Sequence, residues 1–120
     1  MTQERLTLGR QGEGAAVRCL QNQGMKIVER NLRTPVGEID LVVKSKRILA
    51  FVEVKTRRGS AFGSPDQAVG PPKQRQIVQT AKWYLNDKPH EGLQPRFDVI
   101  AITVSVESFQ VEHITDDFEV

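Results

Sequence analysis

The sequence has a single cysteine, no long apolar run and no low-complexity segment. With Cys19 alone, an internal disulfide and a cysteine-based zinc site are excluded, and Cys19 is best interpreted as a small core residue. No apolar run approaches the roughly 20 residues that a transmembrane helix needs, so no membrane partner is expected. The first residues also lack the basic, apolar and small-residue succession of a secretory signal, which predicts a cytoplasmic protein.

Acidic residues are scarce in the first half of the chain. Residues 1–60 carry 12 lysine and arginine residues against 6 acidic ones, whereas residues 61–120 carry 5 against 9. A basic half suits a polyanion such as nucleic acid, although such asymmetry more often means only a solvated charged face. The length of 120 residues predicts one domain, covering residues 1–120.

Hydrophobic periodicity predicts two helices and five strands, in the order α-β-β-β-α-β-β. The helices are expected over residues 12–23 and 72–86. The strands are expected over residues 25–33, 37–44, 48–56, 96–104 and 109–114, with a surface loop over residues 57–71. The first three strands are expected to form an antiparallel meander. This succession predicts an α/β fold in which helices flank a mixed central sheet.

The start of the first helix is poorly defined by its sequence. Gly9, Gly12 and Gly14 each cost about 1 kcal/mol relative to alanine inside a helix. Their cluster indicates either a later start or a close approach between backbones.

Strand alternation directs three charged residues toward a common face of the sheet. Glu53 and Lys55 project together from one strand. Asp40 projects from the preceding strand. The opposite face of that preceding strand is expected to hold Ile39, Leu41 and Val43.

The turn between these two strands decides whether Asp40 joins Glu53. A turn of two or four residues centred between Ser45 and Lys46 sets Asp40 opposite Phe51. Asp40 and Glu53 are then diagonal neighbours on one face, roughly 7–8 Å apart at the backbone. A three-residue turn would direct Asp40 away unless a bulge restored the phase.

Two adjacent carboxylates with a lysine beside them suit phosphodiester hydrolysis. Asp40 and Glu53 would repel each other and need a cation, and hard oxygen ligands favour Mg²⁺ or Mn²⁺ over zinc. Lys55 can orient or help deprotonate the attacking water and stabilise charge on the phosphate, while the metal acts as Lewis acid. Charged strand residues usually face solvent without any chemistry, but three of them in otherwise apolar strands favour the functional interpretation.

The first helix adds one acidic candidate, Glu13. Three apolar residues follow Glu13 at helical spacing and place it along the apolar stripe of the helix. These residues are Ala16, Val17 and Leu20. An inward carboxylate needs a partner, so Glu13 is expected either to reach the same cation, directly or through water, or to form a cap or salt bridge.

Asp40 followed by Glu53-x-Lys55 on the next strand resembles the PD-(D/E)xK nuclease superfamily, which includes restriction endonucleases and archaeal-type Holliday junction resolvases. A wider pattern extends over most of the chain. It comprises Gly12-Glu13, Arg30-Asn31, Gly37-Glu38-Ile39-Asp40-Leu41, Phe51-Val52-Glu53-Val54-Lys55, Phe62-Gly63, Ala68-Val69, Lys73 and Arg96-Phe97-Asp98-Val99. This pattern is similar to the YraN-like family of predicted endonucleases. The chain departs from the superfamily name in having Ile39 rather than proline before Asp40, a position that the superfamily holds loosely.

The resemblance implies a restriction-endonuclease-like core in a single nuclease-like domain. It implies Asp40 and Glu53 as metal ligands, Lys55 as the catalytic lysine, and Glu13 as the accessory helix carboxylate of resolvase relatives. The implied partner is DNA, including branched DNA. Because resolvases cut two symmetric strands as dimers, the resemblance also implies a homodimer.

Several other basic and aromatic residues have two interpretations. Arg57, Arg58 and Lys73 follow the proposed active strand or begin the second helix, where they either bind phosphates or are solvated loop charges. Tyr84 is expected in the core. Trp83 is left open between packing and base stacking.

Two functions follow from these residues. The leading hypothesis is a divalent-metal-dependent DNA endonuclease. The competing hypothesis is a non-catalytic nucleic-acid-binding module that keeps the same fold and charge. Neither hypothesis uses His90 or His113, which lack metal-ligand spacing.

Overall fold

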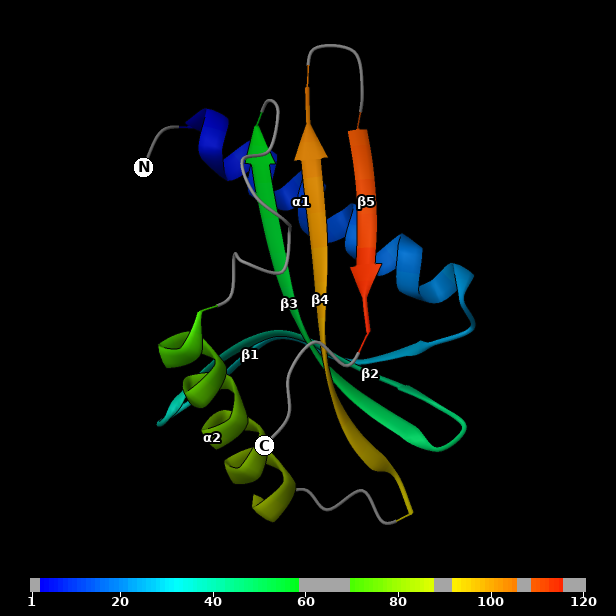
Figure 1. The fold of residues 1–120 in the computed structure, drawn as a ribbon, viewed down its shortest axis with the longest axis vertical. Helices are drawn as coiled ribbons and strands as arrows, with labels where there is room; N and C mark the ends of the chain where they lie inside the picture. The colour runs from blue at the N-terminus through cyan, green and yellow to red at the C-terminus, as the bar shows by residue number, and fades with distance from the viewer. Residues whose placement is uncertain (1–2, 59–69, 88–91, 106–108, 116–120) are drawn as a thin grey trace.

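Two helices and five strands make up the computed structural model, which describes residues 3–58, 70–87, 92–105 and 109–115. The elements are α1 (Gln3–Asn22), β1 (Lys26–Thr34), β2 (Gly37–Ser45), β3 (Ile48–Arg58), α2 (Pro71–Asp87), β4 (Gln94–Val104) and β5 (Phe109–Ile114). One sheet has the order β1-β2-β3-β4-β5, with β3 and β4 parallel and the other pairs antiparallel (Figure 1). The predicted α/β fold, its element order and its mixed sheet flanked by helices are confirmed.

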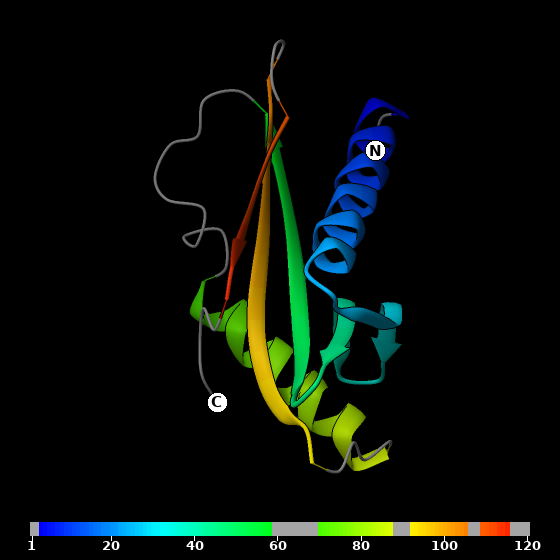
Figure 2. The ribbon, with the colours of Figure 1, turned by 90° about the vertical axis from the view of Figure 1, so that its right-hand side faces the viewer.

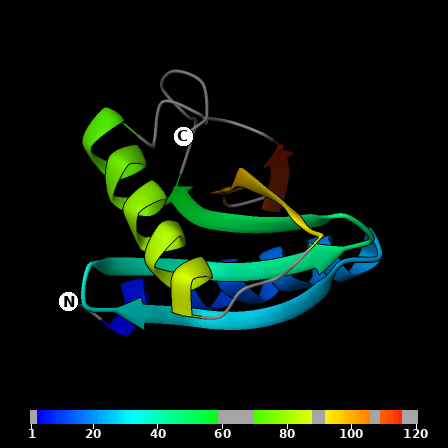
Figure 3. The ribbon, with the colours of Figure 1, turned by 90° about the horizontal axis from the view of Figure 1, so that it is seen from below.

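The two helices cover opposite faces of the sheet (Figure 2). Helix α2 forms the crossover between the parallel strands β3 and β4, and it runs across β1 and β2 (Figure 3). Most of the predicted loop over residues 57–71, like His90, lies outside the described residues. Within the part of the chain that the structure describes, neither helix is long and apolar enough to cross a membrane.

Each helix packs its apolar stripe into a separate half of the core. The core under α2 contains Ile39, Val42, Leu49, Phe51, Ile77, Val78, Ala81, Tyr84, Phe97 and Val99. The core under α1 contains Ala15, Ala16, Val17, Leu20, Met25, Leu41, Val43, Ala50, Val52, Ile100 and Ile102. Tyr84 is buried as predicted, packs edge-on against Phe51 and donates a hydrogen bond to Glu29 at 3.1 Å. Alternate residues of β3 therefore pack against α2 and α1 in turn, because successive strand residues point to opposite faces of the sheet.

Helix α1 begins at Gln3, well before the predicted start at residue 12. The helix continues through Gly9, Gly12 and Gly14. Gly12 lies where α1 comes into close contact with β3. A Cβ atom at Gly12 would collide with the hydroxyl of Thr56. The close-approach interpretation is confirmed at Gly12, and the late start is wrong.

The β2–β3 register differs by two residues from the prediction. Ser45 pairs with Ile48 across a two-residue turn, and the ladder continues to the pair Leu41 and Val52. Asp40 is therefore level with Glu53 and not with Phe51. A two-residue shift preserves alternation, so the predicted faces of β3 survive the error in register.

Alternation in β2 breaks at Asp40, against the prediction of one shared face for its apolar residues. Ile39 packs under α2, whereas Leu41 and Val43 pack under α1. On the neighbouring strand β1, Asn31 has φ of 52°, in the left-handed region that asparagine tolerates better than most residues. This backbone irregularity lies beside the point where the candidate residues converge.

Candidate active site

Four charged side chains from three elements meet where β2 and β3 pass the start of α2. Asp40 comes from β2, Glu53 and Lys55 from β3, and Lys73 from the first turn of α2. The Nζ atoms of Lys55 and Lys73 lie 3.9 and 3.8 Å from the same oxygen, Oε1 of Glu53. Glu53 is only 7% exposed, so a buried carboxylate lies at the centre of the group.

Asp40 is held by the neighbouring strand. Its Oδ2 accepts a hydrogen bond of 2.8 Å from the backbone N–H of Val54. This bond lies just beyond the last ladder pair of β2 and β3, Leu41 with Val52. A side chain thus satisfies a backbone donor where the strands separate, and the same bond fixes the orientation of the carboxylate.

The protonation of both carboxylates is perturbed in the same direction. Burial, followed by the negative charge of Asp40, raises the pKa of Glu53 to about 7, against the opposing charges of Lys73 and Lys55. Burial also raises the pKa of Asp40, and the hydrogen bond from Val54 and the charge of Lys73 offset this only in part. The two lysines therefore leave the pair short of positive charge, which a proton or a metal cation can supply.

Lys73 contributes more to this site than the sequence suggested. It was expected to bind phosphate or to be a solvated loop charge, and its position on the first turn of α2 brings it beside Glu53. Its charge lowers the pKa of Asp40 and of Glu53 more than the charge of Lys55 does. Phosphate binding by Lys73 stays a prediction.

The two other basic candidates lie at the end of β3. Alternation places Arg57 on the strand face that also carries Glu53 and Lys55. The backbone of Arg58 ends the strand, and its side chain lies outside the described residues. Neither position contradicts phosphate binding, which stays a prediction for both arginines.

Glu13 forms a salt bridge with β1, one of the two roles expected for it. Its Oε1 accepts hydrogen bonds from Arg30 Nε and Nη2 at 3.1 and 3.0 Å, and from Asn31 Nδ2 at 3.1 Å. Neighbouring strand residues normally face opposite sides, and the left-handed backbone of Asn31 lets both side chains reach one acceptor. The charge of Glu13 also raises the pKa of Asp40, so α1 acts on the site electrostatically.

Asp40 and Glu53 suit a hard divalent cation as a two-carboxylate set. Mg²⁺ is commonly held by one or two carboxylates while it keeps several waters. No group of three or more acidic, histidine or cysteine side chains among the described residues is arranged to hold a metal ion. Direct metal ligation by Glu13 therefore stays a prediction, while a site built on Asp40 and Glu53 needs no third protein ligand.

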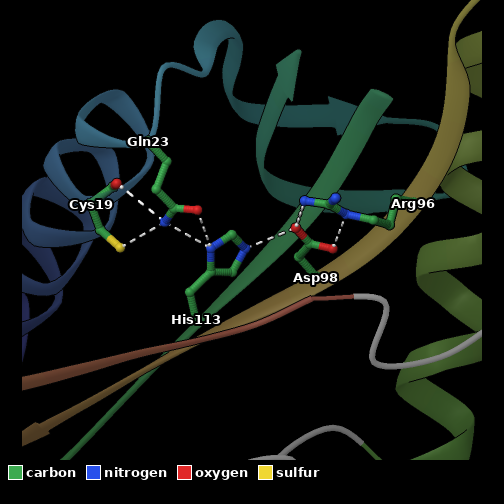
Figure 4. Close-up of polar contacts among 5 residues, drawn as sticks. All are labelled: Cys19, Gln23, Arg96, Asp98 and His113. Carbon is green, nitrogen blue, oxygen red and sulfur yellow. Dashed lines mark hydrogen bonds and ion pairs between the residues drawn. The ribbon is translucent and has the colours of Figure 1, made fainter. Parts of the chain in front are cut away.

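A second polar cluster joins β4, β5 and the end of α1, and the sequence predicted no function for it (Figure 4). Asp98 is 0% exposed, and its two oxygens accept hydrogen bonds of 2.9 and 2.8 Å from Arg96. Nε2 of His113 lies 2.8 Å from Asp98 Oδ2, and Nδ1 of the same ring lies 2.9 Å from Gln23 Nε2. Gln23 in turn donates to the backbone oxygen of Cys19 at 3.3 Å.

Only part of this cluster had a signal in the sequence. Arg96 and Asp98 stand two positions apart in a mostly apolar strand, so they share a face and can pair. The contribution of His113 depends on the β4–β5 register, in which it pairs with Ile100. No local pattern specifies that register.

The residues that match a known protein family include nearly all of both clusters. A family model described as "Uncharacterised protein family UPF0102" matches residues 12–102, which include all four charged residues of the candidate site. The chain belongs to the UPF0102 family. This membership confirms the resemblance to the YraN-like family that the sequence pattern indicated.

UPF0102 proteins of several bacteria are similar over most of their length. The UPF0102 protein of Syntrophotalea carbinolica is 55% identical over 120 residues, covering 100% of this chain and 98% of that protein. A UPF0102 protein of Desulfosudis oleivorans is 51% identical over 102 residues, with 85% and 83% covered. A UPF0102 protein of Geotalea daltonii is 46% identical over 114 residues, with 94% and 90% covered. These names specify the family and no reaction, so the function must be argued from the site.

Proposed function

We propose that this UPF0102 protein is an endonuclease that hydrolyses DNA phosphodiester bonds with Mg²⁺ or Mn²⁺. The observation that carries the proposal is the buried Glu53, which lies beside Asp40 and within 4 Å of two lysine ammonium groups. Burying a carboxylate without full compensation costs free energy, and perturbed carboxylates of this kind are concentrated at functional sites. A cation bound by Asp40 and Glu53 would supply the missing charge.

Asp40 and Glu53 would hold the metal. The hydrogen bond from Val54 already orients Asp40, so little reorganisation is needed when a ligand binds. When bound, the metal supplies a Lewis acid for the phosphate and lowers the pKa of the attacking water. Glu13, held by Arg30 and Asn31, would act on this centre through its charge and through water.

Lys55 and Lys73 would act on the phosphate and the water. Both side chains are partly exposed, so their ammonium groups can reach a DNA strand at the surface. Lys55 orients the water that attacks phosphorus, and Lys73 stabilises the negative charge that grows on the non-bridging oxygens. The attacking water loses its proton to solvent, the bond from phosphorus to the leaving oxygen breaks, and that oxygen takes a proton from solvent water. Arg57 lies on the same strand face and would bind a neighbouring phosphate.

DNA as the substrate agrees with the basic first half of the chain and with the predicted cytoplasmic location. Residues 1–60 have a net charge of +6, whereas residues 61–120 have −4. A positive surface speeds encounter with DNA and supplies affinity that is independent of sequence. The homodimer that the resemblance implies stays a prediction.

A cleavage assay tests the proposal. Linear, nicked and four-way-junction DNA would be incubated with Mg²⁺ or Mn²⁺ and with wild type, Asp40→Ala, Lys55→Ala or Lys44→Ala. Lys44 is an exposed lysine of β2 and serves as the matched control for Lys55. We expect metal-dependent cleavage by wild type and Lys44→Ala, and a loss of about 10²–10⁴-fold in the two site variants.

Two outcomes would count against the endonuclease. Equal cleavage by wild type and both site variants would indicate a contaminating nuclease. Binding of every DNA without cleavage under any metal would favour the non-catalytic nucleic-acid-binding module instead.

A further inference from the structure

The outward face of α2 carries an exposed aromatic residue among basic and amide side chains. Arg75, Gln79, Lys82 and Trp83 recur at helical spacing, so they form one stripe along the helix. All four are exposed. Trp83 is the only tryptophan of the chain, and it is 39% exposed. The buried residues of α2, including its neighbour Tyr84, lie on the other side of the helix. We call this exposed set the α2 stripe.

The charge of α2 is of one sign along most of its length. Residues 71–86 include Lys73, Arg75 and Lys82 but no aspartate or glutamate, and the first acidic residue is Asp87 at the end. A solvated helix face usually mixes charges of both signs. The α2 stripe therefore suits a polyanion along the whole helix, beyond the contact of Lys73 with Glu53.

The α2 stripe begins near the candidate active site, because Arg75 lies two residues after Lys73. The helix begins at that site, where Lys73 lies 3.8 Å from Glu53. Trp83 follows ten residues later, about 15 Å along the helix axis at 1.5 Å per residue. The β1–β2 turn lies beside the same helix, since a Cβ atom on Gly37 would contact Gln76 and Thr80. A strand leaving the site along α2 would thus pass Trp83 within a few nucleotides.

We propose that the α2 stripe binds an unpaired stretch of the DNA strand that is cut at the candidate site, with one base stacked on Trp83. The proposal rests on the proposed endonuclease function and specifies its substrate class: DNA with unpaired nucleotides next to the cut. Bases inside a duplex are stacked on each other and offer no face to a protein ring. Basic residues interleaved with an exposed aromatic ring are the typical means of holding single strands.

Intrinsic fluorescence gives a direct test, because Trp83 is the only tryptophan. Full-length protein would be titrated in EDTA, which prevents cleavage, with an oligo-dT single strand and with a blunt duplex of equal length. We expect saturable quenching of Trp83 by the single strand and little quenching by the duplex. Salt should weaken the single-strand complex, since phosphate contacts release counterions.

Binding measured by anisotropy of a labelled single strand separates stacking from charge. Trp83→Ala should raise the Kd for the single strand by about 5–150-fold, and Trp83→Phe by less because it keeps a ring. Phe109→Ala is the matched control, since Phe109 is also an exposed aromatic residue but lies on β5. It should leave the Kd unchanged.

Three results would overturn this assignment. The first is a single strand that binds without quenching Trp83. The second is an unchanged Kd in Trp83→Ala. The third is quenching by poly-glutamate at least as strong as by oligo-dT, which would indicate an acidic protein partner.

The cleavage assay distinguishes this failure from failure of the endonuclease. If wild type and Trp83→Ala cut flapped and fully paired DNA equally well, the α2 stripe is not the substrate site but the endonuclease stands. If Trp83 is quenched and its loss weakens binding while nothing is cut, the binding site stands and the endonuclease fails.

Discussion

Two buried carboxylates on the same sheet, Asp98 and Glu53, differ in the hydrogen bonds and ion pairs that they form. Asp98 is 0% exposed and receives two hydrogen bonds from Arg96, with His113 at 2.8 Å. Glu53 is 7% exposed, and its two lysines stay 3.8 and 3.9 Å away, beyond hydrogen-bond length. Both carboxylates are thus buried. They differ in how closely positively charged groups compensate their negative charge.

The difference indicates opposite roles for the two sites. A buried carboxylate with short charged hydrogen bonds ties elements together, and the Asp98 cluster joins β4, β5 and α1. A buried carboxylate that keeps a raised pKa retains capacity for another cation, and Glu53 is in that condition. The Asp98 cluster is therefore expected to stabilise the fold, whereas the Glu53 site is the proposed place of metal binding and chemistry.

Removing the Asp98 carboxylate should have the largest effect on stability. Asp98→Ala leaves the Arg96 guanidinium without its buried partner, and breaking such a pair typically costs about 3–5 kcal/mol. The free energy of unfolding would be measured by urea denaturation, with DNA cleavage assayed on the folded fraction. Folded Asp98→Ala should still cleave, because the cluster does not include the candidate site. A stable protein without activity would reverse the roles given to the two sites.

Neutralising Glu53 should have the opposite effect on stability. The folded-state pKa of about 7 lies above the ordinary glutamate pKa of 4.5. Glu53 therefore contributes stability below pH 4.5, which is lost as the pH rises to about 7. Glu53→Gln stays neutral throughout, so at pH 8 without metal it should be more stable than wild type by up to about 3 kcal/mol. Near pH 4.5 the two should be nearly equal.

Urea denaturation in EDTA at several pH values measures this difference. Glu38→Gln is the matched control, since it makes the same substitution at an exposed carboxylate of β2. A Glu53→Gln variant that is less stable than wild type at pH 8 would mean that its lysines already compensate the charge. Cleavage should be lost in Glu53→Gln whatever its stability.

Alternation predicted which face of β3 carries Glu53, because the period of two depends only on the strand itself. The register could not be predicted, since it depends on the turn after Ser45, and nothing local distinguishes a two-residue turn placed there from one placed a residue earlier. Neither the left-handed backbone of Asn31 in β1 nor the break in alternation at Asp40 in β2 had a signal in the pattern of apolar residues. The pairing of His113 with Asp98 depends on contacts between distant segments, and no pattern within β5 specifies it.

Metal should stabilise the Glu53 site and leave the Asp98 cluster unaffected. At a Mn²⁺ concentration about 100 times Kd, binding to the folded state alone would add roughly 2.7 kcal/mol. Because the metal competes with a proton on Glu53, its apparent affinity should rise with pH up to about 7 and then level off. The shift in Tm with Mn²⁺ at pH 6 and pH 8 measures both effects. Retention of that shift in Asp40→Asn or Glu53→Gln would place the ion elsewhere.

The smallest effect is expected at the edge of the Asp98 cluster. Gln23 lies 2.9 Å from His113 and donates a hydrogen bond to the backbone oxygen of Cys19. The contacts of Asp98 with His113 and Arg96 do not involve Gln23. Gln23→Ala should therefore cost only about 0.5–1.5 kcal/mol in urea denaturation, the usual contribution of a hydrogen bond near the surface. Gln21→Ala, at an exposed position in the last turn of α1, should cost less. A loss in Gln23→Ala as large as in Asp98→Ala would mean that α1 holds His113 in place, and that the cluster stabilises the fold as one unit.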